Sequence, residues 1–245
     1  MLKVQNITFH YPNQQNDDPV IDNLNLDIEE GTFVSILGHS GCGKSTLLRI
    51  IAGLEKPDNG KVQCTDSSDL PNTAVVFQDY SLFPWMTAEK NIAFGIRQSL
   101  KVTKKEAMLM ASDYLEKVGM SQEKEKYPCQ LSGGMRQRVA IARAFAMDTQ
   151  LLLMDEPFGA LDIKTRYQMQ DLLLNVWNGT DRKKTVIFVT HDVDEALLLS
   201  ERVLFLKDGT ISIDHKMNMD KEMRKTELMN TDEYQELRQK IEQEF

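Results

Sequence analysis

Residues 38–45 read Gly-His-Ser-Gly-Cys-Gly-Lys-Ser, and this segment is the strongest indication of the fold class. It fits the phosphate-binding pattern G-x-x-x-x-G-K-[S/T], in which glycines let backbone N–H groups turn inward around an anion. An apolar run over residues 32–37 precedes it, and a helical pattern over residues 45–52 follows, so the helix N-terminus adds its positive end. Lys44 supplies a point charge for the terminal phosphates, and the Ser45 hydroxyl is suited to Mg²⁺. A chance glycine turn is the alternative, but it does not account for the strand and helix on either side.

A second stretch, residues 151–156, reads Leu-Leu-Leu-Met-Asp-Glu, an apolar strand pattern that ends in two carboxylates. Sites in parallel sheets open at the carboxyl ends of the strands, so we expect both acids to face the phosphate loop. Asp155 is then expected to hold Mg²⁺ through its shell, and Glu156 to polarise the attacking water. The alternative is an exposed acidic pair that caps the next helix.

Residues 131–138 read Leu-Ser-Gly-Gly-Met-Arg-Gln-Arg, a Ser-Gly-Gly turn that opens another helix. The Ser132 hydroxyl, the N–H groups of Gly133 and Gly134, and the helix terminus are the ingredients of a second anion site. A plain N-cap by Ser132 is the alternative that helix physics alone favours. Two anion sites in one small domain indicate a phosphate gripped from both sides, which two chains face to face can do.

The composition limits the remaining classes. The 245 residues are 41% hydrophobic and 27% charged with a net charge of −8, which disfavours wholesale disorder and nonspecific nucleic-acid binding. No apolar run approaches the roughly 20 residues of a membrane-spanning helix, and no signal-peptide pattern opens the chain. The three cysteines, at positions 42, 64 and 129, form neither a metal-ligand pair nor a disulfide framework, which favours the cytoplasm.

Strand and helix patterns alternate along the chain, which predicts an α/β fold with a largely parallel sheet. Strands are expected at residues 20–28, 32–37, 73–77, 150–154, 185–190, 203–206 and 210–213, and helices at 45–52, 132–147, 164–177 and 192–199. The middle of the chain is helical, and Thr103 with Glu106 predicts a capping box for a helix that stops near Gly119.

The predicted organisation is a single domain. Its core comprises residues 1–84 and 148–215, a helical subdomain spans 85–147, and a helical tail spans 216–245. In the tail, Tyr234, Leu237, Ile241 and Phe245 are spaced to line one face of a final helix.

Taken together, the phosphate loop, the 131–137 signature and the 151–156 strand resemble the ATP-binding-cassette (ABC) ATPase family, in the family's order and spacing. The resemblance runs from about Val4 to Ile213. It implies a P-loop NTPase core with a mainly parallel sheet, an N-terminal antiparallel β-subdomain and an inserted helical subdomain. It also implies ATP and Mg²⁺ as cofactors and a head-to-tail dimer, in which ATP lies between the phosphate loop of one copy and Ser132 of the other. ATP binding closes this dimer, and hydrolysis with Glu156 as base reopens it.

The resemblance assigns four further positions. Tyr11 falls where the family stacks an aromatic ring on adenine, Gln78 where it contacts Mg²⁺ and water, and His191 where it contacts the γ-phosphate. The loop 160–162 matches the one that crosses to the partner copy. The alternatives are strand packing for Tyr11, a polar loop residue for Gln78 and a structural histidine for His191.

The expected site therefore has three groups of residues. The nucleotide contacts are Tyr11, Gly38, His39, Ser40, Gly41, Cys42, Gly43, Lys44, Ser45, Thr46, Ser132, Gly133, Gly134 and Asp162. The catalytic residues are Lys44, Gln78, Glu156 and His191, and the Mg²⁺ ligands are Ser45, Gln78 and Asp155.

Two positions depart from the family's usual pattern. Met135 stands where the signature usually has glutamine; the phosphate contacts belong to Ser132 and the glycine backbone, so we expect the site to survive. Cys42 lies inside the phosphate loop, where it is either a small filler or a thiol whose alkylation would disturb ATP binding.

A single cassette without a membrane span resembles the ATPase subunits of bacterial importers. The run 80–87, Tyr-Ser-Leu-Phe-Pro-Trp-Met-Thr, followed by Asn91, resembles the nitrate/sulfonate/taurine-type importer group. The implied partners are a second copy, two membrane permease subunits and an extracytoplasmic solute-binding protein, with the chain peripheral on the cytoplasmic face of the membrane and no nucleic acid bound. Phe83 and Trp85 would suit a groove for a permease helix, or else belong to the core of the helical insert.

Two other classes remain as alternatives. A non-transport ABC ATPase uses ATP as a conformational switch in DNA repair or on ribosomes, but usually carries a long coiled-coil insert or two cassettes. A switch GTPase or kinase has the phosphate loop but no use for a second phosphate grip at Ser132. Within the importer group, sulfonates, nitrate, taurine or a vitamin-precursor pyrimidine are all open as cargo.

Overall fold

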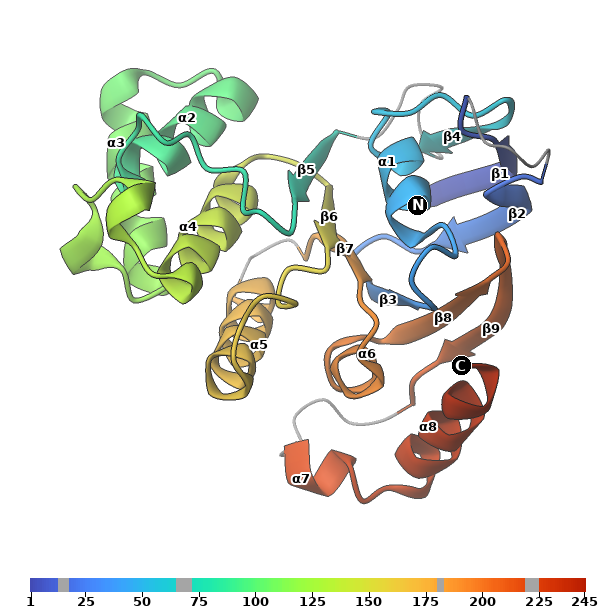
Figure 1. Ribbon diagram of the computed structural model, residues 1–245. Coiled ribbons are helices and arrows are strands. Elements are labelled where there is room, and N and C mark those ends of the chain that lie inside the picture. Colours follow the sequence, from blue (N-terminus) through green and yellow to red (C-terminus); the bar gives the residue numbers. More distant parts are fainter. Residues whose placement is uncertain (13–17, 65–71, 180–182, 219–224) are drawn as a thin grey trace. The chain divides into compact units, whose positions relative to one another are not determined.

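The structure is a computed structural model that describes all residues except 13–17, 65–71, 180–182 and 219–224. Residues 219–224, which belong to the predicted tail 216–245, therefore lie outside the described residues. The chain forms two compact units (Figure 1). Unit one combines Met1–Pro71 with Thr185–Phe245, and unit two spans Asn72–Lys184, so that residues 85–147 lie inside unit two.

Unit one begins with a three-stranded antiparallel sheet of order β2-β1-β4. Its strands are β1 (Leu2–Phe9), β2 (Ile21–Ile28) and β4 (Asn59–Cys64), and β1 pairs with both neighbours. Apolar residues of β2 are buried while the polar residues between them are exposed, which is the period-two pattern of a half-buried strand. The N-terminal antiparallel subdomain is therefore confirmed.

The second layer of unit one is mainly parallel. The strand β3 (Phe33–Leu37) lies between β7 (Thr185–Val189) and β8 (Arg202–Lys207) and is parallel to both, while β9 (Thr210–Lys216) pairs antiparallel with β8. Every residue of β3 and β7 is buried, because helices or the first sheet cover both faces of such strands. This layer confirms the predicted α/β class.

Among the described residues of unit one, four helices cover this layer. They are α1 (Lys44–Ile51), α6 (Val193–Leu199), α7 (Lys225–Leu228) and α8 (Asp232–Glu244). In Figure 1, α1 and the three-stranded sheet lie on one side of β3, β8 and β9, and α6, α7 and α8 lie on the other.

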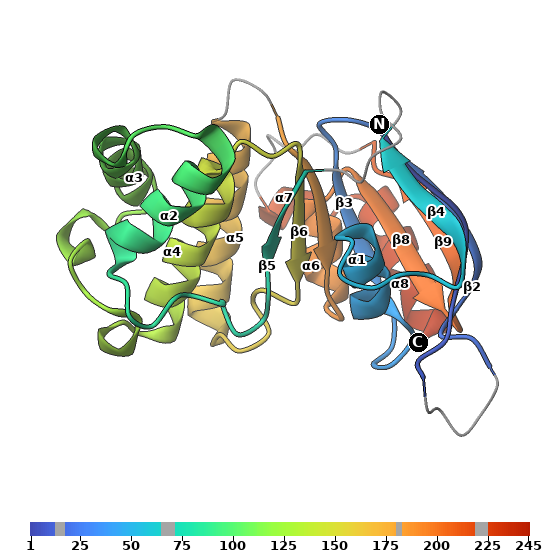
Figure 2. The same cartoon turned by 90° about the horizontal axis from the view of Figure 1, so that it is seen from above.

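Unit two carries the helical subdomain. Two parallel strands, β5 (Thr73–Val76) and β6 (Leu151–Asp155), precede and follow the helices α2 (Ala88–Leu100), α3 (Lys104–Lys117) and α4 (Gly133–Ala146). Figure 2 shows these three helices gathered together, with α5 (Ile163–Asn178) beside α4. Short 3₁₀ turns at Ser121–Glu123 and Pro128–Gln130 connect α3 to α4.

The predicted capping box at the start of α3 is present. The Glu106 backbone N–H donates to the Thr103 hydroxyl at 3.3 Å, and the Thr103 N–H donates to the Glu106 carboxylate at 2.8 Å. The Thr103 hydroxyl also donates to the Glu106 carboxylate at 2.7 Å, and this bond, together with that from the Thr103 N–H, lowers the pKa of Glu106. Gly119 follows the helix with φ +67°, a conformation that glycine adopts without steric cost.

Candidate nucleotide site

The loop 38–43 connects the buried strand β3 to helix α1 and turns on three glycines. Gly38, Gly41 and Gly43 have φ of +153°, +85° and +105°. A Cβ atom on Gly38 would lie 2.3 Å from the carbonyl oxygen of Leu206, and one on Gly43 would lie 2.8 Å from that of Val20. Glycine is therefore required for both backbone shape and close approach at these positions.

Lys44 is the first residue of α1, and its side chain reaches back to the start of this loop. Its side chain is buried, and its ammonium donates to the carbonyl oxygens of Gly38 at 2.8 Å and His39 at 2.7 Å. The positive charge is thus held against the inner rim of the loop by neutral carbonyl groups. A phosphate oxygen is a stronger partner for an ammonium than a carbonyl, so the lysine is placed to exchange these bonds for a nucleotide.

The start of α1 is open to an anion. Gly43 offers no side chain as N-cap, and the first turn contains no acidic residue. Among the described helices of seven residues or more, every other one has a side-chain cap: Thr87, Thr103, Ser132, Asp162, Asp192 and Thr231. The N–H groups of the first turn of α1 are what a phosphate would accept from, so the loop fits the predicted nucleotide.

Tyr11 lies next to the phosphate loop. Its hydroxyl is 3.0 Å from the Thr46 hydroxyl in the first turn of α1, and its ring meets Phe9 edge-on at 5.0 Å. The predicted adenine-stacking residue and the predicted phosphate contacts Ser45 and Thr46 therefore belong to one local site. Packing against the end of β1, the alternative interpretation of Tyr11, is also present.

Cys42 packs inside the loop. A Cβ atom on Gly38 would lie 2.6 Å from its sulfur, and Lys44 Nζ lies 4.0 Å from it. Burial raises the pKa of the Cys42 thiol, and the nearby ammonium opposes this only in part. The thiol is therefore a poor nucleophile at neutral pH, which favours the small-filler interpretation.

His191 follows β7 in a turn that buried polar groups hold in place. The Thr190 hydroxyl donates to the Glu195 carboxylate at 2.8 Å and accepts from the Asp192 N–H at 3.0 Å. The Asp192 carboxylate caps α6 by accepting from the Glu195 N–H at 3.0 Å. These bonds fix the backbone of the turn and leave the His191 side chain exposed.

In unit two, Glu156 follows directly after β6. Its φ is +44°, in the left-handed region that costs a non-glycine residue about 1–3 kcal/mol and recurs at functional sites. A Cβ atom on Gly159 would lie 3.6 Å from Gln78 Nε2 and 3.7 Å from Glu156 Oε2. The adjacent ends of β5 and β6 therefore bring Gln78 and Glu156 to the same glycine, as parallel strand ends predict.

The signature turn opens α4. The Ser132 hydroxyl accepts from the Met135 N–H at 3.3 Å, so the N-cap that helix physics predicts is present. A Cβ atom on Gly133 would make only ordinary contacts, whereas one on Gly134 would lie 2.9 Å from the Thr165 methyl group. Met135 itself is half-buried in the first turn of α4.

Asp162 caps α5. Its carboxylate accepts from the Thr165 N–H at 3.0 Å. A hydrogen bond from the Thr165 side chain and, after it, this backbone bond hold the pKa of Asp162 below its ordinary value. The side chain remains exposed, next to exposed Ala160, so the loop that the resemblance assigns to a partner copy lies at the surface of unit two.

The loop after Gln78 is fixed by two residues for which sequence reasoning gave no role. The buried Asn91 amide accepts from the Phe83 N–H at 2.8 Å and donates to the Phe83 carbonyl oxygen at 3.2 Å. The Arg143 guanidinium, on α4, donates to the carbonyl oxygens of Ser81 at 2.9 Å and Tyr80 at 3.4 Å. An arginine within the apolar run of a buried helix is the signal that could have indicated such a role.

The aromatic residues of this loop divide into two kinds. Trp85 is 69% exposed, which excludes it from the core of the helical insert. Phe83 is half-buried, and its ring centroid lies 5.5 Å from that of Trp85 and 4.9 Å from that of Phe94. Phe83 therefore packs between the exposed indole and α2. A rigid loop that exposes one large aromatic residue is suited to contact with another protein.

The predicted site residues divide between the units. Tyr11, residues 38–46 and His191 lie in unit one, while Gln78, residues 132–134, Asp155, Glu156 and Asp162 lie in unit two. Within each unit the structure fixes their local geometry. Among the described residues no cluster of three or more histidine, cysteine or acidic side chains is arranged to hold a metal, and no helix is long and apolar enough to span a membrane.

A family model described as "ABC transporter" matches residues 21–159, more than half of the chain. The chain belongs to this family. It is an ABC transporter ATPase, and the P-loop fold with its antiparallel sheet, mainly parallel sheet and helical subdomain agrees with that assignment.

Its relatives include proteins named for the transport of anions. The bicarbonate transport ATP-binding protein CmpD of Synechocystis is 42% identical, over 85% of this chain and 74% of the relative. The nitrate transport protein NasD of Klebsiella oxytoca and the aliphatic sulfonates import ATP-binding protein SsuB of Bacillus cereus are each 39% identical. These two matches cover 98% and 100% of this chain, and 94% and 95% of the relatives. The predicted relationship to the nitrate and sulfonate importer group is therefore confirmed.

Among solved structures, the chain is similar to a dimeric, post-hydrolysis structure of the ATP-binding cassette MJ0796 bound to ADP and Pi. The TM-score is 0.78 at 36% identity, with 90% of this chain and 100% of the other covered.

Proposed function

We propose that this chain is the ATP-hydrolysing subunit of an importer for a small anionic solute. The observation that carries the nucleotide part is the buried Lys44 ammonium beside the first turn of α1, which has no side-chain cap and no acidic residue. The family and its importer relatives support the transport part. Because relatives at 39–42% identity are named for bicarbonate, nitrate and sulfonates, identity does not single out one of these anions or taurine.

Binding of ATP begins in unit one. The first-turn N–H groups of α1 and the Lys44 ammonium take the phosphates, and the ammonium gives up the carbonyl oxygens of Gly38 and His39 in exchange. Tyr11 offers its ring to the adenine from a position next to Thr46. His191 contacts the terminal phosphate from the turn held by Thr190.

Hydrolysis requires the groups of unit two. Glu156 accepts the proton of the attacking water, and Gln78 beside it orients that water. The Ser45 hydroxyl, the Gln78 amide oxygen and the Asp155 carboxylate are the oxygen donors that Mg²⁺ prefers alongside phosphates, so these residues fit the ion. When bound, Mg²⁺ neutralises charge on the phosphate oxygens.

The second phosphate grip comes from another copy of the chain. A serine hydroxyl has one proton and two acceptor positions, so Ser132 can cap its own helix and still donate to a γ-phosphate oxygen. The cap and the functional interpretation of Ser132 are therefore compatible. Asp162, exposed at the start of α5, would face the partner copy in the same dimer. Because ATP fills much of this interface, the dimer should be weak without nucleotide.

The permease contact is assigned to the loop from Gln78 to Trp85. Arg143 joins this loop to α4, whose first turn is the signature. A displacement of Trp85 would therefore be transmitted to both Gln78 and Ser132 within unit two. In this way two membrane permease subunits, and through them an extracytoplasmic solute-binding protein, would be coupled to hydrolysis at the cytoplasmic face of the membrane.

The test is isolation of the tagged chain from native membranes with identification of every co-purifying protein. We expect a multi-span permease and a binding protein, and the binding protein is then screened with nitrate, bicarbonate, taurine and sulfonates. Trp85→Ala should lose the permease, whereas Leu109→Ala, which removes a 62% exposed residue from α3, should keep it. If the wild-type chain brings down no membrane subunit, the importer assignment is wrong and the non-transport ATP switch replaces it.

A further inference from the structure

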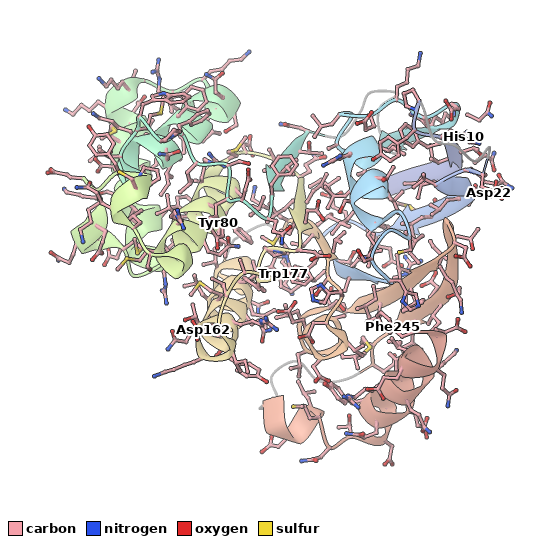
Figure 3. All side chains as sticks on the ribbon, in the orientation of Figure 1. His10, Asp22, Tyr80, Asp162, Trp177 and Phe245 are labelled. Atoms are coloured by element: carbon pink, nitrogen blue, oxygen red, sulfur yellow. The ribbon has the colours of Figure 1, made fainter. Side chains whose placement is uncertain are left out.

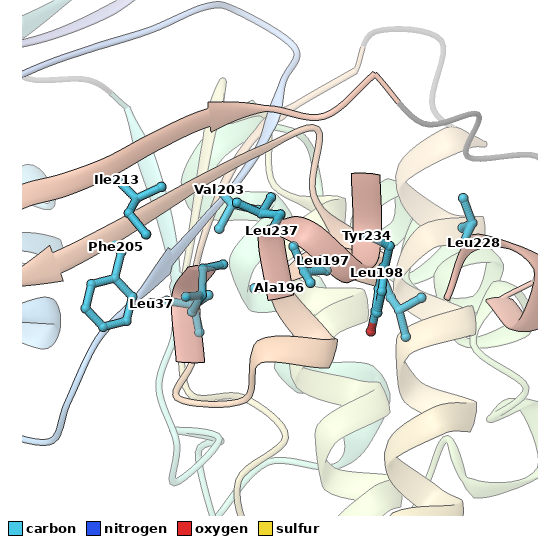
Figure 4. Packing of buried hydrophobic residues seen from close by; sticks show 11 residues of the cluster. Leu37, Ala196, Leu197, Leu198, Val203, Phe205, Ile213, Leu228, Tyr234 and Leu237 are labelled. Atoms are coloured by element: carbon cyan, nitrogen blue, oxygen red, sulfur yellow. The ribbon is translucent and has the colours of Figure 1, made fainter. Parts of the chain in front are cut away.

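The final helix, α8, packs its apolar side onto unit one. Tyr234, Leu237 and Ile241 are buried in a cluster with residues 196–198 of α6, as the spacing in the sequence predicted (Figure 4). The same cluster contains Leu37, the last residue of β3 before the phosphate loop. The end of β3, which leads into the phosphate loop, and α6, which follows His191, therefore share one hydrophobic cluster with α8.

The first half of α8 is bonded to the helix that follows His191. The Tyr234 hydroxyl donates to Asp194 Oδ1 at 2.6 Å, and Arg238 Nε donates to the same oxygen at 3.1 Å. Burial and this carboxylate raise the pKa of Tyr234, so the hydroxyl remains a donor. Asp194 lies in the first turn of α6, three residues after His191.

The far end of α8 contacts the phosphate loop itself. The Phe245 ring meets the His39 ring edge-on at 4.9 Å and the Phe205 ring at 5.0 Å (Figure 3). The Glu244 carboxylate pairs with the Lys207 ammonium at 2.9 Å. The spacing in the sequence predicted that Phe245 would extend the buried face of α8; instead it is 43% exposed and packs on His39.

His39 connects this contact to the chemistry of the loop. Its ring packs on Phe245, while its backbone carbonyl oxygen accepts from the Lys44 ammonium at 2.7 Å. A displacement of the His39 backbone therefore changes the position of Lys44. Since backbone amides bind a phosphate only when they point inward together, restraint of this residue lowers the conformational cost of binding.

We propose that α8 is a strut that holds the phosphate loop and the His191 turn in register, with Phe245 and Glu244 as positioning residues for ATP binding. One end of the helix fixes α6 through Asp194, and the other fixes the loop through His39. The contacts lie within unit one and need no second copy of the chain. The proposal rests on the proposed role of Lys44 in binding ATP.

The test compares Phe245→Ala and Phe245→Tyr with the wild-type chain. We measure ATP binding by the isolated chain, and KM and kcat for ATP hydrolysis. Loss of one aromatic contact should raise the Kd and KM for ATP about threefold to tenfold, while kcat changes less than about twofold. Tyrosine should restore both values because it keeps the ring. Glu244→Gln, which removes the ion pair with Lys207 at nearly constant volume, should shift Kd in the same direction by less.

Two controls separate the possible outcomes. Glu236→Gln, an exposed change on the same helix, should leave Kd unchanged. If Phe245→Ala is folded and binds ATP like the wild type while Lys44→Ala binds it at least about tenfold more weakly, the strut is refuted and the proposed function stands. If Lys44→Ala binds ATP like the wild type, the proposed nucleotide site fails, and the strut fails with it.

Discussion

The helices α1 and α4 both begin at a glycine-rich turn, yet their first turns are built differently. α1 starts after Gly43 at φ +105° with no side-chain cap, whereas α4 starts after Ser132, whose hydroxyl accepts from the Met135 N–H. The first turn of α1 therefore has no side-chain cap, whereas that of α4 is capped by a hydroxyl of its own chain. From this difference we infer that α1 binds ATP in the isolated chain, while α4 contributes only when a second copy brings its nucleotide.

The largest expected effect is a loss of ATP hydrolysis without a loss of ATP binding. Glu156→Gln keeps a polar side chain of the same size but removes the general base, so turnover should fall roughly 10²–10⁴-fold while ATP still binds. ATPase assays together with nucleotide binding measure this. Glu125→Gln, an exposed change in unit two, serves as control. Near wild-type hydrolysis by the Glu156 variant would overturn its assignment.

The second test compares the two anion sites directly. Lys44→Ala removes charged hydrogen bonds to phosphate and should weaken ATP binding by the isolated chain about 10- to 100-fold. Ser132→Ala should leave that binding unchanged but reduce nucleotide-dependent dimerisation and ATPase activity, with a loss of about 1 kcal/mol of stability from the helix cap. Calorimetric titration and sedimentation measure these quantities. Equal loss of ATP binding in both variants would contradict the division of roles.

A third pair of variants distinguishes the glycines by stability. Gly38→Ala should destabilise the fold by about 1–3 kcal/mol, since its φ is +153° and the new methyl group would meet the Leu206 carbonyl. Gly133→Ala should stabilise it by about 0.5–1 kcal/mol, because the site is helical and has room. Denaturant unfolding gives both values. Gly133→Ala should nevertheless lower ATPase activity by crowding the second phosphate contact, and full activity would show that α4 does not approach the nucleotide.

The smallest effect concerns the thiol in the phosphate loop. Because burial raises the pKa of Cys42, its thiolate fraction is low at neutral pH and increases as pH passes above the ordinary thiol range. Alkylation of Cys42, followed by mass spectrometry, should therefore be slow at pH 7, faster at higher pH, and slower again with ATP present. Rapid, pH-independent modification near neutrality would refute this prediction.

Local pattern was sufficient where a residue's role depends on its immediate neighbours. The phosphate loop, the signature turn and the capping box of α3 each follow from spacing along the chain, and the helix bounds agree to within one residue at either end of α1 and α4. The strand β4 was missed because its sequence, Asn-Gly-Lys-Val-Gln-Cys, has no apolar alternation; pairing with β1 makes it a strand.

The amino-acid sequence was sufficient to predict the fold class and the family, and it led to the set of site residues that we propose, because glycines, charges and strand ends follow local backbone rules. It did not predict that Arg143 and Asn91 hold the loop after Gln78 or that Phe245 packs on His39, which the tertiary structure shows. The hydrogen bond of Arg143 to Ser81 spans 62 residues, and the Phe245 contact joins residues that are farther apart still. No periodicity encodes such pairs, since they form only when packing of separate elements brings the side chains together.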